Sequence, residues 1–448
     1  MKVSFYMLMA MSLIVTQINA DEPTPLDTEK VDEVVVTSSI LNTSRILNPL
    51  YVIDGDEIKD DATTSLGEAV DSYLGVSIAD YGAAVGQPII RGMSGPRVKI
   101  LKNGMVNRDV SGLGVDHLND VDLHDIEQIE IIKGPSSLLY ANGTIGGIIN
   151  VVNNTIARED FDGQEVNAGL ETQSANDGDI QEFNYKNLLG GWLNFSLGYK
   201  NTELGNFDIP DGAVVHEEED HGDDDHDEHE EEALSYVENS DFASEAKQFG
   251  VSRTGEWGYF GMSYENLESL YGIPFHGDEH GDEHGDEHGD ELGGLIRANH
   301  LQQDAELKGY ELEFGKVFDL ARGDLTVSFS RDSISGEFDD GSDIPRMVPD
   351  RNIYSLVYSE PTLDLSLRLK DVHKQTDIGF NETVSEGYEM LDLRVSKTFS
   401  VDQGAELTLS LFANNLLNEV ARNHSSFVKD PVPLPGRNYG IKLSLSNF

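Results

Sequence analysis

The chain of 448 residues contains no cysteine, and it has only 31 Lys and Arg against 82 Asp and Glu. Without cysteine, neither a disulfide framework nor a thiolate metal site can form. The formal net charge of −51 would repel the phosphate backbone of a nucleic acid. We therefore exclude nucleic acids as partners and expect cations instead.

The chain also lacks any long apolar run after its first twenty residues. Residues 1–20 combine a basic start at Lys2 with an apolar stretch and the ending Ile18–Ala20, a pattern typical of a secretory signal peptide. An N-terminal membrane anchor is the alternative, but the apolar stretch is shorter than the roughly 20 residues of a helical span. We predict cleavage before Asp21 and no helical transmembrane domain.

What the sequence has in abundance is histidine beside acidic residues, in two expected loops at 205–235 and 272–298. The first loop contains His216, His221, His226 and His229, and the second repeats His-Gly-Asp-Glu, with His276, His280, His284 and His288. Imidazole and carboxylate groups are ligands of borderline divalent cations, zinc first, then nickel and copper. A merely solvated acidic loop is the alternative, but it needs no regularly spaced histidine. We predict weak, collective and rapidly exchanging metal binding.

Upstream of these loops the chain divides into a polar segment and a compact domain. Residues 21–48 are polar except for the apolar island Glu33-Val34-Val35-Val36-Thr37. Residues 49–155 alternate short apolar strands with one helical stretch around Thr64–Tyr73, for which Asp61 or Thr63 is the expected N-cap. This pattern predicts a mixed α/β domain.

Residues 165–448 instead show a period of two. In Leu193–Lys200 and Leu363–Lys370, apolar residues alternate strictly with polar or charged ones, which predicts strands with one apolar face. A soluble sandwich and a membrane barrel both fit this alternation. Segments of 9–11 residues, a charged second face and aromatic residues near segment ends favour a transmembrane β-barrel with a wet lumen.

Two stretches of the α/β domain resemble the plug of TonB-dependent outer-membrane receptors. They are Gly86–Gly104, with its Ile90-Arg91-Gly92 turn, and Ile126–Val151, with its Lys133-Gly134-Pro135 turn. Phe412–Asn418 is similar to the family's late barrel strand. The resemblance implies an N-terminal plug within a β-barrel in the outer membrane of a Gram-negative bacterium. It also implies the energy-transducing protein TonB as a partner, bound through Glu33–Thr37 as the TonB box. Such a short β-prone segment suits strand addition.

The resemblance singles out nine plug residues, which are Arg91, Gly92, Arg97, Glu127, Glu130, Gly134, Pro135, Gly146 and Gly147. The glycines permit tight turns and positive φ where the plug meets the barrel wall. For Arg91, Arg97, and Glu127 or Glu130, we expect charged plug–wall contacts that break or slide during transport. Ordinary packing within a small domain is the alternative for each of them.

A narrower resemblance concerns the substrate. The Asp116-His117 pair, the histidine-rich loops and the tail Arg422–Arg437 are similar to the zinc-uptake branch of the family, where a plug Asp-His pair meets a Glu and a His from the barrel. The resemblance implies Asp116 and His117 as ligands of Zn²⁺. A surface turn is the alternative for this pair. Candidate barrel ligands are His300, Glu306 and His373.

The chain departs from the family in length. The resemblance implies twenty-two barrel strands, but residues 165–448 hold only about twelve strand-like segments. We therefore expect a shortened barrel, incomplete or open, that encloses the plug poorly. We expect the missing strands to fall between Phe314 and Leu325, and transport to be compromised.

Three functions remain open at this point. The first is TonB-powered uptake of zinc or a related metal, with the metal as ligand and outer-membrane lipid around the barrel. The second is uptake of a ferric siderophore, with the histidine-rich loops as a charged collar. The third is a surface metal-binding protein that does not transport. No nucleophile–base pair has a recognisable spacing, so we expect neither an enzyme nor a catalytic cofactor.

Overall fold

The computed structural model describes residues 51–60, 65–81, 85–109, 111, 117–119, 121–213, 234–274, 303–401 and 404–447. The predicted signal peptide, the segment Glu33–Thr37, Asp116, His300 and all eight histidines of the two histidine-rich loops lie outside these residues. Predictions about them remain predictions. Within the described residues, no helix is long and apolar enough to cross a membrane.

The N-terminal domain, the plug, contains a five-stranded sheet in the order β1-β6-β7-β4-β5 and a separate β2–β3 pair. All of its pairings are antiparallel except that of β4 with β7. Its elements are β1 (Tyr51–Asp54), α2 (Gly55–Asp60), α3 (Leu66–Val70), β2 (Val76–Asp80), β3 (Gly86–Ile90), η1 (Gly95–Arg97), β4 (Val98–Lys102), β5 (Met105–Val106), β6 (Ile126–Lys133), η3 (Gly134–Leu139) and β7 (Gly147–Asn153).

The plug has an aliphatic core built where β6 and β7 pack against α3. Ile129, Ile131 and Ile149 are completely buried there, together with Val70 of the helix. The N-cap of α3 is Ser65, whose hydroxyl accepts a hydrogen bond from the backbone N of Glu68, while the Glu68 carboxylate accepts from the Ser65 backbone N. This capping box provides hydrogen-bond acceptors for two backbone N–H groups at the start of the helix. The expected caps, Asp61 and Thr63, were therefore wrong.

The second part of the chain forms one twelve-stranded antiparallel sheet, here called the wall. Its order is β12-β11-β10-β9-β8-β19-β18-β17-β16-β15-β14-β13. The strands are β8 (Gln164–Gln173), β9 (Gly178–Leu189), β10 (Leu193–Leu204), β11 (Phe242–Gly255), β12 (Gly258–Tyr271), β13 (Ala305–Asp319), β14 (Asp324–Phe338), β15 (Arg351–Glu360), β16 (Leu363–Val372), β17 (Tyr388–Ser400), β18 (Ala405–Asn414) and β19 (Asn438–Asn447). These strands confirm the fold class of a β-barrel wall of about twelve strands with an N-terminal plug.

The predicted alternation places polar residues on the face that contacts the plug. In β10, Asn194 and Ser196 lie on one face and are 1% and 4% exposed. Leu197 lies on the opposite face and is 42% exposed. The Ser196 hydroxyl donates to the carbonyl of Thr155, just beyond β7. A period-two strand must direct successive side chains to opposite faces, so the apolar phase faces outward, as lipid requires.

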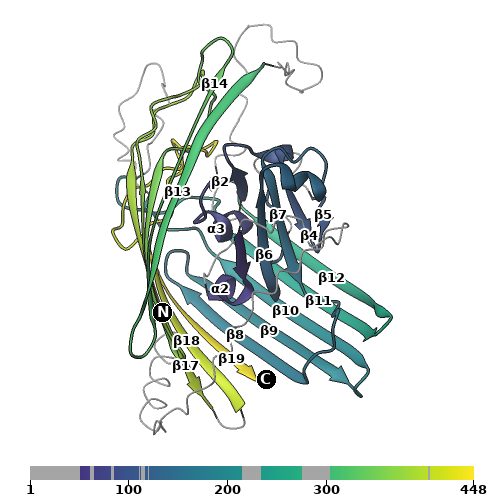
Figure 1. Ribbon diagram of the computed structural model, residues 1–448. Coiled ribbons are helices and arrows are strands. Elements are labelled where there is room, and N and C mark those ends of the chain that lie inside the picture. The colour runs from purple at the N-terminus through teal and green to yellow at the C-terminus, as the bar shows by residue number, and fades with distance from the viewer. Residues whose placement is uncertain are drawn as a thin grey trace, which may run out of the picture. The chain divides into compact units, whose positions relative to one another are not determined.

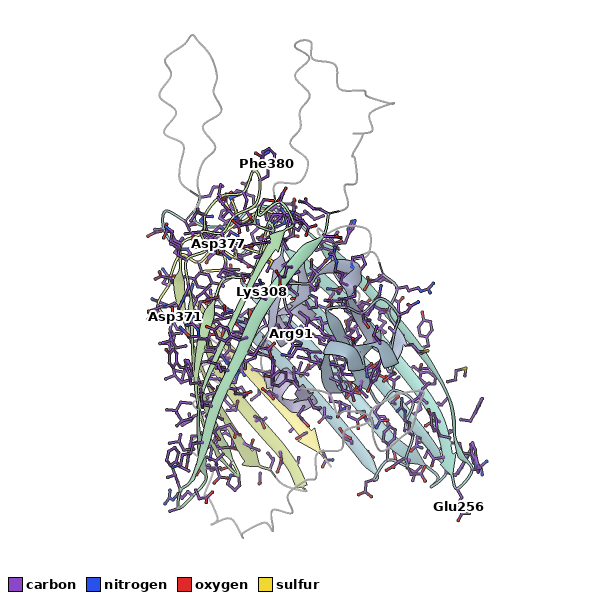
Figure 2. The ribbon with its side chains drawn as sticks, turned by 45° about the horizontal axis from the view of Figure 1, so that its top comes forward. Arg91, Glu256, Lys308, Asp371, Asp377 and Phe380 are labelled. Carbon is purple, nitrogen blue, oxygen red and sulfur yellow. The ribbon has the colours of Figure 1, made fainter. Side chains whose placement is uncertain are left out.

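The connections between wall strands are short at one end and long at the other. Figure 2 places Glu256, in the two-residue turn from β11 to β12, at one end, and Phe380, in the connection from β16 to β17, at the other. Trp192 and Trp257 lie in the short turns and are 54% and 63% exposed. Short turns and long loops at opposite ends are typical of outer-membrane barrels.

Strands β12 and β13 are the two edges of the wall, and they lie on either side of the plug (Figure 1). Lys102 of the plug contacts Glu265 on β12, and Arg91 contacts Glu311 on β13. Among the described residues, β12 and β13 do not pair with each other. The expected break between Phe314 and Leu325 was wrong, because β13 and β14 form a regular hairpin in which Phe318 is opposite Leu325.

Candidate functional site

His117, the predicted plug ligand, lies against the end of strand β12. Its Nδ1 is 3.3 Å from the hydroxyl of Tyr271, the last residue of that strand. The Gln87 amide donates to the backbone carbonyl of His117 at 3.2 Å, which fixes this segment on β3. His117 is thus held where the wall enters its second histidine-rich loop.

The first histidine-rich loop leaves the wall from an apolar cluster. Phe207, Ile209 and Ala213 pack with Val237 at the other end of the loop, and with Val428 and Val432 from the connection between β18 and β19. Tyr81 of the plug packs against the same cluster. The Arg422 guanidinium donates to the carbonyl of Ala213. The described ends of this loop are therefore anchored next to the plug.

The structure does not bring the described barrel candidates together around His117. Glu306, on the edge strand β13, is exposed and pairs with Lys308 at 3.0 Å. His373 follows β16, and its Nε2 is 3.0 Å from the Asn352 amide and 3.8 Å from Asp371. Within the described part of the chain, no three His, Asp or Glu side chains converge as metal ligands.

The tail that resembles the zinc-uptake branch has a bracing role in this structure. His424 is 1% exposed, its Nδ1 is 2.8 Å from the Ser385 hydroxyl and its Nε2 is 3.2 Å from the Glu382 carboxylate. Burial, reinforced by Lys429, lowers the pKa of His424 to about 4. The imidazole is therefore neutral at neutral pH and joins the connections 373–387 and 415–437.

The plug and the wall are joined by ion pairs, and Arg91 contributes one of them as predicted. Its Nε is 2.8 Å from Glu311 on β13, whose other carboxylate oxygen is 3.0 Å from Lys133 Nζ. Figure 2 shows Arg91 beside β13, near Lys308. Burial lowers the pKa of Lys133, and Glu311 opposes that shift. One wall carboxylate thus binds two plug cations.

A second group of ion pairs centres on Arg351 of β15, which is 4% exposed. It pairs with Asp332 of β14 at 2.8 Å and donates to the plug carbonyls of Asp71 at 2.6 Å, Tyr73 at 2.8 Å and Val76. Lys370 of β16 pairs with the Asp71 carboxylate at 2.8 Å. The Arg351 guanidinium therefore bonds three backbone acceptors between the end of α3 and the start of β2.

The other charged plug motif residues differ from Arg91 in their surroundings. Arg97 and Glu127 are exposed. Glu130 is completely buried within the plug, where it accepts hydrogen bonds from the amides of Gln128 and Asn150, both at 2.9 Å. Burial raises its pKa. Glu130 therefore does not form the expected plug–wall contact, because both of its carboxylate oxygens are bonded by amides within the plug.

The glycines of the motif lie where a side chain would collide or strain the backbone. Gly92 has φ +71°, and a Cβ there would meet Ile334 and Met347 of the wall side at 3.0 and 3.1 Å. Gly147 lies in β7 with φ +153°, and its Cβ would be 2.7 Å from the carbonyl of Ile132. Gly134, the first residue of η3, also has a positive φ and precedes Pro135. A Cβ at Gly146 would be 2.7 Å from the Cβ of Met93.

A cavity of about 310 Å³ lies between the plug and the wall. Its lining includes Asp71, Asp80, Arg351, Lys370 and Asn423. The Asn423 amide donates to the Asp80 carboxylate at 2.6 Å and to the Ile78 carbonyl at 2.8 Å. Burial raises the pKa of Asp80 to about 7. This carboxyl therefore changes its charge near neutral pH, at a contact between β2 and the connection from β18 to β19.

We expect Asp80→Asn to stabilise the protein at pH 8 and to flatten its pH dependence. The folded state holds the Asp80 proton up to about pH 7, while the unfolded state releases it near pH 4, so stability falls as pH rises between these values. The asparagine keeps the hydrogen bond and removes the charge, for a gain of about 1–3 kcal/mol at pH 8. Thermal unfolding at pH 5 and pH 8 measures this effect. Asp162→Asn, at an exposed carboxylate, is the control, and an equal pH slope in Asp80→Asn and wild type would contradict the prediction.

Comparisons with known proteins identify the N-terminal domain. Residues 42–148 match the family model of the TonB-dependent Receptor Plug Domain. The vitamin B12 transporter BtuB of Vibrio vulnificus (strain CMCP6) is 28% identical over 186 residues, which are 40% of this chain and 29% of that protein. The chain therefore spans less than a third of the length of this curated relative.

Solved structures share the combined fold of plug and wall. The copper transporter OprC has a TM-score of 0.59 at 11% identity, covering 88% of this chain and 97% of that chain. The FrpB iron transporter from Neisseria meningitidis has a TM-score of 0.59 at 10% identity, covering 89% and 99%. Similarity at this level of identity establishes the fold, a plug domain with a β-barrel wall.

Proposed function

We propose that the chain is a member of the TonB-dependent receptor family in the outer membrane of a Gram-negative bacterium, and that it captures and takes up a scarce divalent metal, zinc first. The observation that carries the proposal is the contact between His117 and Tyr271. It puts a plug histidine beside the last residue of β12. The repeat with four histidines comes shortly after that residue in the sequence. The plug pair and the loop thus offer the same kinds of metal ligand, imidazole and carboxylate.

Chain geometry limits how far the repeat lies from the plug histidine. His276 comes five positions after Tyr271, and an extended chain spans at most about 3.3–3.6 Å per residue, so their Cα atoms are within about 18 Å. Asp116 precedes His117 directly. In the proposed sequence of events, the loops concentrate the metal by weak binding, and Asp116 with His117 receives it at the plug. The neutral imidazole and the carboxylate supply nitrogen and oxygen ligands that suit zinc.

We expect a peptide covering His276–Glu291 to bind zinc at neutral pH and to lose it as pH falls through the imidazole range near 6.5. Protons compete with the metal for the imidazole nitrogens. Isothermal titration at pH 7.5 and pH 5.5 measures the difference. The matched control replaces the four histidines by glutamine and keeps every carboxylate. Equal binding by both peptides would remove the reason for preferring zinc to a siderophore.

In cells, the proposal is tested by metal uptake under limitation. Replacing Asp116 and His117 by Asn and Gln should lower uptake of radioactive zinc and leave uptake of ferric siderophores by other receptors unchanged. Glu306→Gln, on the edge strand and away from His117, serves as the matched carboxylate control. If deleting the gene impairs growth under iron limitation and not under zinc limitation, the ferric-siderophore function replaces this one. If neither condition reveals a phenotype but zinc still binds, the chain is a surface metal-binding protein.

A further inference from the structure

The two edge strands of the wall, β12 and β13, are long and unbroken. They contain 14 and 15 residues, no proline, and no register irregularity in their pairing with β11 and β14. Among the described residues, each of them is bordered by a strand on one side only. Natural sheet edges are usually short or interrupted by proline or a bulge. In lipid, backbone N–H and C=O groups without partners are strongly unfavourable, so edges of this length need a partner strand.

The outward side chains of β12 are more exposed than an outward side chain on a strand with two neighbours. Phe260, Met262 and Tyr264 are 74%, 63% and 65% exposed. Leu367 of β16 also faces outward, but it lies between β15 and β17 and is 38% exposed. Neighbouring strands cover part of each side chain, because residues directly opposite each other have Cβ atoms about 4.5–5.5 Å apart. The surface of β12 is therefore suited to a further strand.

The directions of β12 and β13 fit pairing between two copies of the chain. Strand β12 starts at the short-turn end of the wall, where Figure 2 shows Glu256, and β13 ends at that same end. Two copies with one orientation in the membrane therefore bring β12 of one copy antiparallel to β13 of the other, at two seams related by a twofold axis. Within one chain, the plug holds the edges apart by pairing with Glu265 of β12 and Glu311 of β13.

The lengths of the two strands select one register for this pairing. Outward side chains have even residue numbers on both strands, because the odd-numbered Glu265 and Glu311 face the plug. Of the antiparallel registers that set even numbers opposite even numbers, one alone pairs all 14 residues of β12 with residues of β13. It sets Glu268 opposite Lys308, as well as Tyr264 opposite Leu312 and Met262 opposite Phe314. Opposite charges and aromatic–aliphatic pairs directly across from each other stabilise a sheet.

The charges already present on the edges are compatible with this register. Glu268 lies directly opposite Glu245 of β11, so a lysine on its other side relieves a contact between like charges. Lys308 pairs with Glu306 on its own strand, but both side chains are exposed, and such a pair contributes little to stability. On the inward face, the two carboxylates that come together each bind a plug cation, which offsets their repulsion.

We propose that two copies of this chain complete each other's wall, with β12 of each copy paired to β13 of the other in this register. Each seam uses one β12 and one β13, so two copies leave no edge unpaired. The inference rests on the proposed location of the wall in the outer membrane, and it holds whatever the cargo is.

The chain contains no cysteine, so two introduced cysteines report on the seam alone. Residues directly opposite each other on antiparallel strands have Cα atoms about 4.5–5.5 Å apart, which suits a disulfide. Cells that express Glu268→Cys with one tag and Lys308→Cys with another tag are treated with diamide, an oxidant that brings no metal to the histidine-rich loops. In the outer-membrane fraction we expect a shift from the mass of one chain to that of two, in a product that carries both tags.

Lys308→Cys combined with Leu367→Cys, on the outward face of β16, is the matched control and should show no shift. An equal yield from the test and control pairs overturns the proposal. A chain with both Glu268→Cys and Lys308→Cys that forms the disulfide within itself closes its own wall, which also overturns it. Light scattering of the wild-type protein in detergent should give two chains per particle, and one chain per particle overturns the proposal even if a variant fails to insert. Recovery of the protein outside the outer membrane overturns the proposed location, and this inference with it.

Discussion

Val35→Pro is expected to reduce uptake to the background level and to leave binding of the substrate at the cell surface intact. Val35 lies in the middle of Glu33–Thr37, the segment through which the family resemblance implies TonB binding. Strand addition depends on a row of backbone N–H and C=O groups. Proline removes one donor and restricts φ near −65°, and it is tolerated in strands only at edges, first positions and bulges.

The measurement compares surface binding with time-dependent accumulation of labelled metal in cells. Val35→Ala is the matched control, because it shortens the side chain and keeps the amide donor. We expect this control to retain most of the uptake. If Val35→Pro accumulates metal at the wild-type rate, Glu33–Thr37 is not the coupling segment, and energy must reach the plug by another route.

Arg351→Ala is expected to destabilise the docking of the plug on the wall by about 3–5 kcal/mol. The guanidinium is buried, pairs with Asp332, and satisfies three carbonyls between Asp71 and Val76. Its removal takes away the cationic partner of the buried Asp332 carboxylate and one donor from each of those carbonyls.

Hydrogen–deuterium exchange of residues 71–80 measures this loss. A destabilisation of about 3 kcal/mol raises the exchange rate of amides that open with the docking contact roughly a hundredfold. Arg351→Lys keeps the charge and loses the planar fork, so we expect an intermediate rate. Arg253→Ala, an arginine stacked over Trp192 at 5.6 Å on β11, is the control and should leave residues 71–80 unchanged. Slow exchange in Arg351→Ala would mean that the remaining pairs hold the plug.

The wall strands could be predicted from the sequence because their signal is local. Leu193–Lys200 displays its two faces in eight consecutive residues, and a strand must present them alternately. The pairing of strands is not local in this sense. The break was expected near Phe314 and Leu325, yet these residues belong to one hairpin, and the edges of the described sheet are β12 and β13. A change in the apolar pattern alone does not distinguish a turn from a missing strand.

The candidate site was predicted in part for a similar reason. Arg91 and His117 lie in motifs, so the sequence could single out both residues. The structure then places them beside Glu311 and Tyr271. Arg351 contacts the carbonyl of a residue 280 positions earlier, and no local signal marks that pairing. The available signal was its charge at the start of a strand whose centre, Ile353–Tyr358, is apolar except for Ser355. Burial, too, is a property of the folded chain, which is why Glu130 was expected at the plug surface.

The long and short ends of the wall have a consequence for how this protein can change over generations. The tetrapeptide repeat begins five residues after Tyr271, beyond the last strand pairing of β12. Gaining or losing whole copies alters no strand register, and doubling the length of a flexible loop costs only about 0.6 kcal/mol. Copy number can therefore vary among descendants without disturbing the pairing of the wall strands.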